Sequence, residues 1–181
     1  MRLAFACVAF FSTVLTVSSL ALLYAPPIGL SLERTPAAAN QRLVQGRWSD
    51  SRRGGCANSD GWRSNPHYRL RFAGSNAAGP LRVSVLLAPD ATLAQRGTGF
   101  YATTKPPSQC TVKDILRLAD VKFVVGERVA MSFDLRRGNN DNNDVDFYVV
   151  PCTFEPNVDG EFSIILRATQ PFDVVETNAT A

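Results

Sequence analysis

The sequence predicts an all-β domain, an antiparallel β-sandwich of eight strands, preceded by an N-terminal hydrophobic leader. Eight short segments alternate polar and apolar residues or are rich in β-branched and aromatic residues. Clusters of Gly, Pro, Asn and Asp separate them at spacings of about 8–15 residues. The chain between them shows no long amphipathic helix. Together these features favour two packed antiparallel sheets.

Two segments show the alternation most clearly. The segment 67–72 (HYRLRF) places Tyr68, Leu70 and Phe72 on an inward face, and the segment 81–87 does the same with Leu81, Val83, Val85 and Leu87. The other strands are expected at 42–48, 99–104, 121–125, 128–135, 146–154 and 161–169. Residues 111–118 fit either a helical turn with Thr111 as its N-cap or a ninth irregular segment.

The first residues have the pattern of a targeting segment. Arg2 is followed by an uncharged, largely apolar run to Tyr24, which is typical of a secretory signal. The run of about 22 residues is also long enough for a membrane anchor, and a misassigned start is the third reading. We therefore expect a signal peptide or signal anchor at 1–25, a Pro/Ala-rich linker at 26–41, the sandwich at 42–172 and a flexible tail at 173–181. The expected location is the secretory pathway, secreted or anchored, or intracellular if the start is misassigned.

Charge and cysteine content narrow the class further. The 181 residues carry 19 basic and 16 acidic groups, a net of +3, which does not resemble the dense basic footprint of a nucleic-acid-binding protein. Beyond the leader lie Cys56, Cys110 and Cys152, an odd number, which we expect to be buried thiols. Asn178 begins an N-glycosylation sequon, Asn-Ala-Thr.

A cysteine-protease centre built on Cys56 and His67 is not supported. A thiol nucleophile needs a base within hydrogen-bond reach and a group that orients the base. His67 is expected on the outward face of its strand, and Cys56 lies in a Gly-rich loop without a helix N-terminus to lower its pKa. We expect a structural thiol and a surface histidine. A single histidine and the lack of a C-x-x-C motif leave a zinc site equally unsupported.

Two charged groups of residues are candidate binding sites. One is a loop rich in Asp and Asn that offers hard oxygen ligands for Ca²⁺, although its spacing is not that of an EF-hand; its carboxylates are Asp134, Asp141, Asp144 and Asp146. The alternative is that such runs simply form turns. The other is an outward basic row for anionic lipid head groups, formed by His67, Arg69, Arg71 and, on the next strand, Arg82. The alternative there is an ordinary solvated sheet face.

Two separated motifs resemble domain III of the calpains. The first is a Gly-Gly-Cys lead-in to a Trp and an Asn-Pro strand entry, carried by Gly54, Gly55, Cys56, Asn58, Trp62, Asn65, Pro66, Tyr68 and Leu70. The second is similar to the closing signature of that domain, carried by Tyr148, Val149, Val150, Pro151, Thr153, Phe154, Glu155, Pro156, Gly160, Glu161 and Phe162. The resemblance covers roughly residues 44–169. The glycine pair permits a tight turn, and Asn-Pro holds the chain extended into the strand.

The resemblance implies a C2-like sandwich with a regulatory role and without the protease core, hence no enzyme. The sequence departs from the calpain pattern at one loop. The loop that follows the Asn-Pro strand is acidic in calpains, whereas here it is Ala73–Pro80 and contains no carboxylate. The preferred function is a non-catalytic module that engages an anionic membrane surface or a protein partner. The alternatives are a regulatory fragment of a calpain-like protease that acts with, or is truncated from, a catalytic chain, and a secreted interaction protein without lipid affinity.

Overall fold

The structure is a computed structural model that describes residues 40–74, 79–136 and 144–177. All described residues belong to one compact unit, residues 34–181. The predicted leader, most of the linker, Asp141 and Asn178 lie outside the described residues. The described part contains no helix long and apolar enough to cross a membrane.

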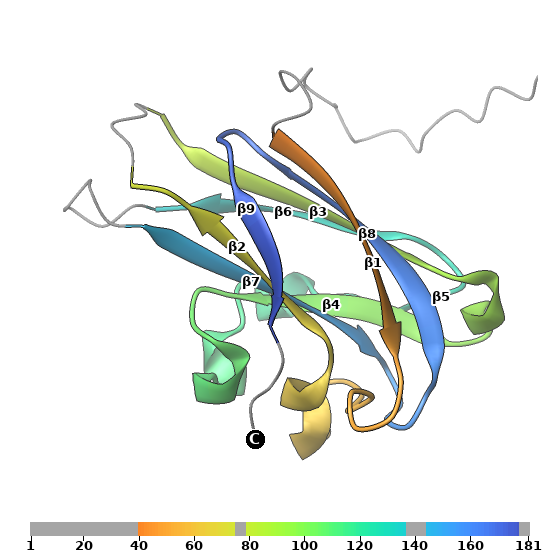
Figure 1. Ribbon diagram of the computed structural model, residues 1–181. Coiled ribbons are helices and arrows are strands. Elements are labelled where there is room, and N and C mark those ends of the chain that lie inside the picture. Colours follow the sequence, from red (N-terminus) through yellow and green to blue (C-terminus); the bar gives the residue numbers. More distant parts are fainter. Residues whose placement is uncertain (1–39, 75–78, 137–143, 178–181) are drawn as a thin grey trace, which may run out of the picture. The chain divides into compact units, whose positions relative to one another are not determined.

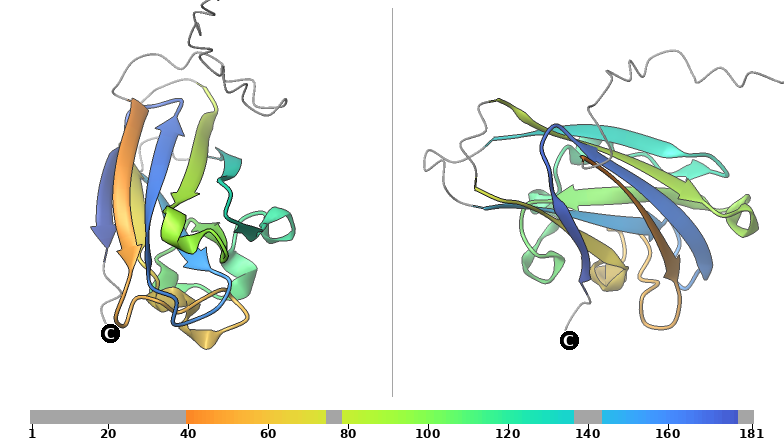
Figure 2. Two further views of the ribbon diagram at one scale, coloured as in Figure 1. Left: turned by 90° about the vertical axis from the view of Figure 1, so that its right-hand side faces the viewer. Right: turned by 45° about the horizontal axis from the view of Figure 1, so that its top comes forward.

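The described residues form two antiparallel sheets that pack face to face, as Figure 1 and the edge-on view in Figure 2 show. The four-stranded sheet has the order β1 (Gln41–Trp48), β8 (Gly160–Ala168), β3 (Leu81–Pro89) and β6 (Val129–Leu135). The five-stranded sheet has the order β5 (Val124–Val125), β4 (Gly97–Thr103), β7 (Val145–Thr153), β2 (His67–Phe72) and β9 (Asp173–Thr177). The predicted all-β, antiparallel sandwich is confirmed, and each of the eight predicted segments contains a strand.

The core lies between the sheets and follows the alternation of the sequence. Tyr68, Leu70 and Phe72 of β2 are buried, as are the predicted inward residues of β3, Leu81, Val83, Val85 and Leu87. Aromatic rings from both sheets close the core, for example Phe133 of β6 against Phe147 of β7, with ring centroids 5.3 Å apart. Each large apolar side chain buried in this way contributes about 1.5–3 kcal/mol.

A second apolar cluster covers the outer face of the five-stranded sheet. Two long connections, 49–66 and 104–123, fold over β4 and β7 and bury Cys56, Trp62, Tyr101, Cys110, Ile115, Val150 and Cys152. The three cysteines are buried and unpaired, as predicted. Within the second connection a short 3-10 helix, Val112–Asp114, follows Thr111, whose backbone N–H and hydroxyl both donate to the Asp114 carboxylate. The helical-turn reading of this segment is therefore correct.

Two expectations are wrong in the structure. Residues 173–177 form strand β9, which pairs with β2 along its whole length, instead of a flexible tail. His67, expected on the surface, is only 4% exposed. β9 makes β2 an interior strand of its sheet, with Thr177 opposite His67. The five residues of β9 (DVVET) show no alternation of polar and apolar residues by which the strand could be recognised without its partner.

Candidate functional site

The predicted basic row is divided by the fold. Arg69 and Arg71 share the outer face of β2, but Arg82 lies on β3, which belongs to the other sheet. His67 is buried, and its Nδ1 lies 3.1 Å from the backbone oxygen of Asn65. Burial lowers the pKa of His67 below its ordinary value, so the ring is neutral at pH 7. The structure thus keeps two of the four residues together on one face.

The predicted acidic residues are the partners of these arginines. Arg69 makes two bonds to Asp146, from Nε at 2.9 Å and Nη2 at 2.7 Å. Arg71 donates to the Asp144 carboxylate from both Nε and Nη2. On the other sheet, Arg82 Nε lies 2.7 Å from Asp134 Oδ1. The residues expected to bind a cation and those expected to bind an anion therefore neutralise one another in three pairs.

These contacts keep the side chains ionised at neutral pH. The backbone N–H of Gly74, 2.9 Å from Asp144 Oδ1, and then the Arg71 guanidinium lower the pKa of Asp144. The hydrogen bond from Arg82 lowers the pKa of Asp134, and the hydrogen bond to Asp146 raises the pKa of Arg69. The Arg71–Asp144 and Arg82–Asp134 pairs are largely solvent-exposed and the Arg69–Asp146 pair is half-buried, so water and salt screen the first two most strongly.

The three described aspartates do not form a metal centre by themselves. Among the described residues, no group of three or more His, Cys, Asp or Glu side chains is placed to hold a metal ion. Asp134 is the second-last residue of β6 in one sheet, whereas Asp144 precedes β7 and Asp146 is its second residue in the other sheet. A calcium ion would have to displace the arginines from the carboxylates. The calcium site stays a prediction.

The two motif segments meet in space and form one corner of the molecule. Asn65 is fully buried and organises the corner. Its Oδ1 accepts a hydrogen bond from the backbone N–H of Gly54 at 3.0 Å. Its Nδ2 lies within donating distance of Gly55 O at 2.7 Å, Trp62 O at 2.9 Å and Cys152 Sγ at 3.3 Å. One side chain of the first motif thus joins its own loop to β7, the strand that carries the second motif.

Backbone contacts complete this corner. Cys56 N donates to Phe154 O at 3.4 Å, and Asn157 N donates to Arg53 O at 2.8 Å. Gly55 has a φ of +75°, and a Cβ there would approach the nitrogen of Pro156 to 2.7 Å. The residue must therefore be glycine for both its conformation and its space. Burial raises the pKa of the Cys152 thiol well above its usual value. The corner is a structural junction in which that thiol remains protonated.

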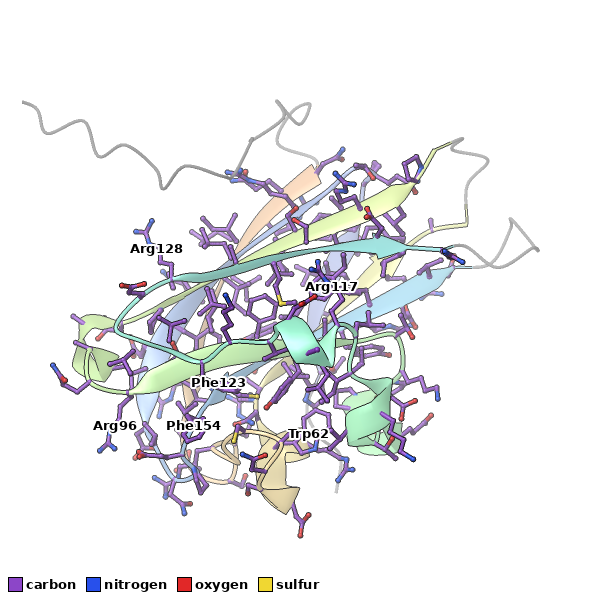
Figure 3. The ribbon with its side chains drawn as sticks, turned by 180° about the vertical axis from the view of Figure 1, so that it is seen from behind. Trp62, Arg96, Arg117, Phe123, Arg128 and Phe154 are labelled. Carbon is purple, nitrogen blue, oxygen red and sulfur yellow. The ribbon has the colours of Figure 1, made fainter. Side chains whose placement is uncertain are left out.

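An exposed aromatic side chain at the sheet edge was missed by sequence reasoning. Phe154, directly after β7, is 51% exposed, and its ring contacts Phe123 with centroids 5.7 Å apart. Figure 3 shows both rings near Arg96, whose guanidinium donates to Glu155 at 2.5 Å. Val125 of the short edge strand β5 is exposed as well. Phe154 belongs to the second motif, but its exposure is set by where β7 ends, and no pattern in the sequence marks that.

A cleft of about 660 Å³ lies beside β1 and β8. Its lining carries charges of both signs, including Arg47, Arg52, Asp90, Glu161 and Glu176. An ion pair between Arg52 and Glu176 forms part of its wall. Basic and acidic side chains are mixed along this lining, so its charge does not indicate which ligand the cleft would bind.

Comparison with known proteins finds relatives over parts of the chain. No family model matches. The chain is 27% identical over 132 residues to serine/threonine-protein kinase 4 homolog B of Dictyostelium discoideum, a match that covers 70% of this chain and 11% of the relative. It is 37% identical over 57 residues to the calpain-type cysteine protease DEK1 of Zea mays and 41% identical over 61 residues to that of Arabidopsis thaliana. Those matches cover 32% and 34% of this chain and 3% and 2% of the relatives.

The chain therefore contains a region related to calpain-type proteases. It spans 11% or less of the length of these curated relatives. The relatives carry the names of two different kinds of enzyme, a protein kinase and a cysteine protease.

Proposed function

We propose that this chain is a non-catalytic, calpain domain III-like regulatory module that acts by binding another protein. The observation that carries the proposal is the pair of enzyme classes among the relatives. Phosphoryl transfer and peptide hydrolysis need different catalytic groups, so a chain with stretches similar to both proteins, 132 residues for the kinase and 57 for the protease, is expected to supply neither. What two unrelated enzymes can share is a domain that binds or positions something beside the catalytic domain.

The corner formed by the two motifs supports the domain III assignment. Residues from the two ends of the resemblance, separated by about one hundred positions, contact one another through Asn65 and Gly55. Contacts between parts so distant in sequence are expected if both motifs serve one inherited fold. The C2-like sandwich that the resemblance implies agrees with two antiparallel sheets of this size.

The geometry also supports a role without peptide hydrolysis. The only histidine is buried, and its Nδ1 is close to a backbone oxygen instead of a catalytic partner. Cys56 is a buried member of the second apolar cluster, without the electropositive, accessible surroundings that activate a thiol. The scaffold role of Cys56 follows from these contacts.

A protein partner fits the charges better than a membrane does. Arg69 and Arg71, the cations expected to meet anionic lipid, are already bonded to Asp146 and Asp144. An anionic surface would therefore have to exchange with a carboxylate at each arginine. We propose a catalytic chain of calpain type as the partner, in agreement with the relatives that bear that name.

Two activity measurements test this function. The purified chain, assayed with a fluorogenic peptide under reducing conditions with Ca²⁺, should release no fluorophore; turnover that Cys56→Ser abolishes would contradict a non-catalytic role. The chain is then titrated into the protease region of the Arabidopsis relative. A saturable change in its rate or calcium dependence is expected. An unrelated β-sandwich domain is the control, and an equal effect of that control, or no effect at all, would refute the regulatory role.

Phospholipid binding is a second candidate, favoured by one observation. Val175 of β9 lies opposite Arg69 in register and is 58% exposed, so an apolar side chain accompanies the two arginines on this face. Cosedimentation with phosphatidylcholine vesicles, with and without phosphatidylserine and Ca²⁺, tests it. Binding to the anionic vesicles should be lost in Arg69→Glu/Arg71→Glu. The control Lys122→Glu/Arg128→Glu has the same net charge and should still bind; equal loss in both variants would indicate a general charge effect.

A further inference from the structure

An apolar row crosses the outer face of the four-stranded sheet. The antiparallel registers place Leu43 of β1 opposite Ile165 of β8, Ile165 opposite Leu86 of β3, and Leu86 opposite Ala130 of β6. All four occupy outward positions, because at least one strand neighbour of each is buried or packs against the core, such as Val44 beside Leu43. Leu43 is 63% exposed. Figure 2 shows these four strands as one continuous layer.

The residues beside this row are almost uncharged. On one side lie Gln41, Arg167, Ser84 and Ser132, with Arg167 Nε donating to Gln41 Oε1 at 2.7 Å, and on the other side lie Gln45, Ser163 and Ala88. Charged side chains gather at the two ends of the sheet, such as Arg82 with Asp134 at one end and Arg47 opposite Glu161 at the other. Arg167 is the one charged residue in these two lines, and an apolar centre with a single cation beside it does not suit a polyanionic ligand such as nucleic acid or an anionic lipid surface.

We infer that the outer face of the four-stranded sheet is a surface through which two copies of this chain associate. Packed face to face about a two-fold axis that runs along the strands between β8 and β3, each copy would bring β1 over β6 of the other. Leu43 then meets Ala130 of the second copy, and Ile165 meets Leu86. The protruding side chain at one end of the row thus faces the smallest side chain at its other end.

The polar residues obey the same symmetry. Under this two-fold axis Gln41 faces Ser132 and Arg167 faces Ser84, so that hydrogen-bonding groups meet one another along the neighbouring line of residues. A two-fold interface uses the same patch on both copies, and a patch that is large at one end and small at the other satisfies that condition. The strands of two sheets that pack face to face cross at about 30° or less. Residue pairs near the centre of the interface therefore stay in contact, and pairs near its ends are displaced sideways.

The size of the face sets the strength of the association. Four strands about 4.8 Å apart and about seven residues long cover roughly 450 Å² on each copy. Standard stable interfaces bury about 800 Å² per partner, so this face is smaller than a standard interface and has the size of a weak, transient one. We therefore expect a reversible dimer with a dissociation constant above about 1 μM.

Sedimentation velocity of residues 34–181 tests the inference. This unit is chosen because it contains every buried member of the two core clusters of the described residues, which lie between Trp48 and Phe172. The sedimentation coefficient should rise from the monomer to the dimer value as the concentration increases through the micromolar range. Leu43→Asp, at an exposed site that tolerates substitution, should weaken the dimer at least tenfold. Val175→Asp, equally exposed but on β9, should leave it unchanged.

An exchange of side-chain size tests the two-fold pairing itself. Leu43→Ala leaves a gap against Ala130 of the second copy, and Ala130→Leu crowds Leu43, so each change alone should weaken the dimer. The double variant Leu43→Ala/Ala130→Leu restores one large and one small residue at each contact and should recover most of the affinity. A chain that stays monomeric at all concentrations, a dimer insensitive to Leu43→Asp, or a double variant weaker than both single ones would overturn the inference.

Discussion

Asn65 and Tyr68 are two buried polar side chains, three positions apart, whose hydrogen bonding is opposite. Asn65 uses both ends of its amide and reaches four groups. The hydroxyl of Tyr68 is buried without a hydrogen-bond partner among the described residues, although the residue is part of the first motif. A buried polar group that is fully bonded fixes a local structure, whereas an unbonded one only costs desolvation energy. The two residues should therefore respond in opposite ways to the loss of their polar atoms.

We expect Asn65→Ala to destabilise the domain by roughly 2–4 kcal/mol, because it leaves the Gly54 N–H and the Gly55 carbonyl without their side-chain partner. Urea unfolding followed by tryptophan fluorescence measures this free energy. Asn58→Ala, at an exposed position of the same motif, is the control and should change it by less than about 0.5 kcal/mol. Similar values for both variants would show that the amide does not hold the corner.

Tyr68→Phe should raise the free energy of unfolding by about 1 kcal/mol, since the ring keeps its place in the core while the unbonded hydroxyl is removed. Gly46 explains why the hydroxyl is so confined, because a Cβ at that position would overlap it. Gly46→Ala should consequently be destabilising, and less so in the Tyr68→Phe background. A loss of stability in Tyr68→Phe, measured by the same urea titration, would mean that the hydroxyl does have a partner.

At the level of strands, the sequence predicts those that carry their own pattern and misses the one that depends on a neighbour. Segments such as 67–72 and 81–87 alternate over six or more residues and were placed correctly. β9 has no such alternation, and its pairing with β2 is a non-local event. The same limit applies to Arg82, since alternation gives the face of a strand but not the sheet to which the strand belongs.

The pairing of β9 with β2 predicts a pH dependence of stability. Burial lowers the pKa of His67 in the folded state, so the unfolded chain takes up the proton first as the pH falls below about 6.5. The stability that the neutral ring permits is complete above that value and is lost as the pH falls toward the lowered pKa. Urea midpoints measured between about pH 7 and pH 5 should decrease, and His67→Gln should flatten this slope. An unchanged slope in the variant would assign it to other groups.

Removal of β9 should reverse the shift at His67. Deletion of residues 173–181 exposes the edge of β2 to water, so the pKa of the imidazole should rise toward its ordinary value of about 6.5. Because the chain has one histidine, its ring signals in an NMR titration are unambiguous. The deletion should also lower the melting temperature. A pKa that remains low in a folded, truncated domain would show that the first motif, and not β9, buries the ring.

Across the whole molecule, the fold joins charged residues that the sequence keeps far apart. The partners in the three arginine–aspartate pairs are 77, 73 and 52 positions from one another. Considered separately, the arginines predict an anion site and the aspartates predict a cation site. Only the pairing of β2 with β7 and of β3 with β6 shows that the arginines and the aspartates bind one another. A candidate site drawn from residue types alone cannot include this, because it is a property of the assembled sheets.

The pairing predicts how calcium binding depends on the arginines. The unmodified chain should show no saturable heat of Ca²⁺ binding by calorimetry up to about 1 mM, the range of weak extracellular calcium modules. Arg69→Gln/Arg71→Gln releases the carboxylates of Asp146 and Asp144 on neighbouring positions, so this variant should gain binding of roughly millimolar strength. Arg117→Gln releases only Asp120, elsewhere on the surface, and should gain none. Calcium binding by the unmodified chain that equals binding by the double variant would contradict this prediction. It would mean that the guanidinium groups do not compete with the ion. The loop between Asp134 and Asp146 would then bind calcium with ligands of its own.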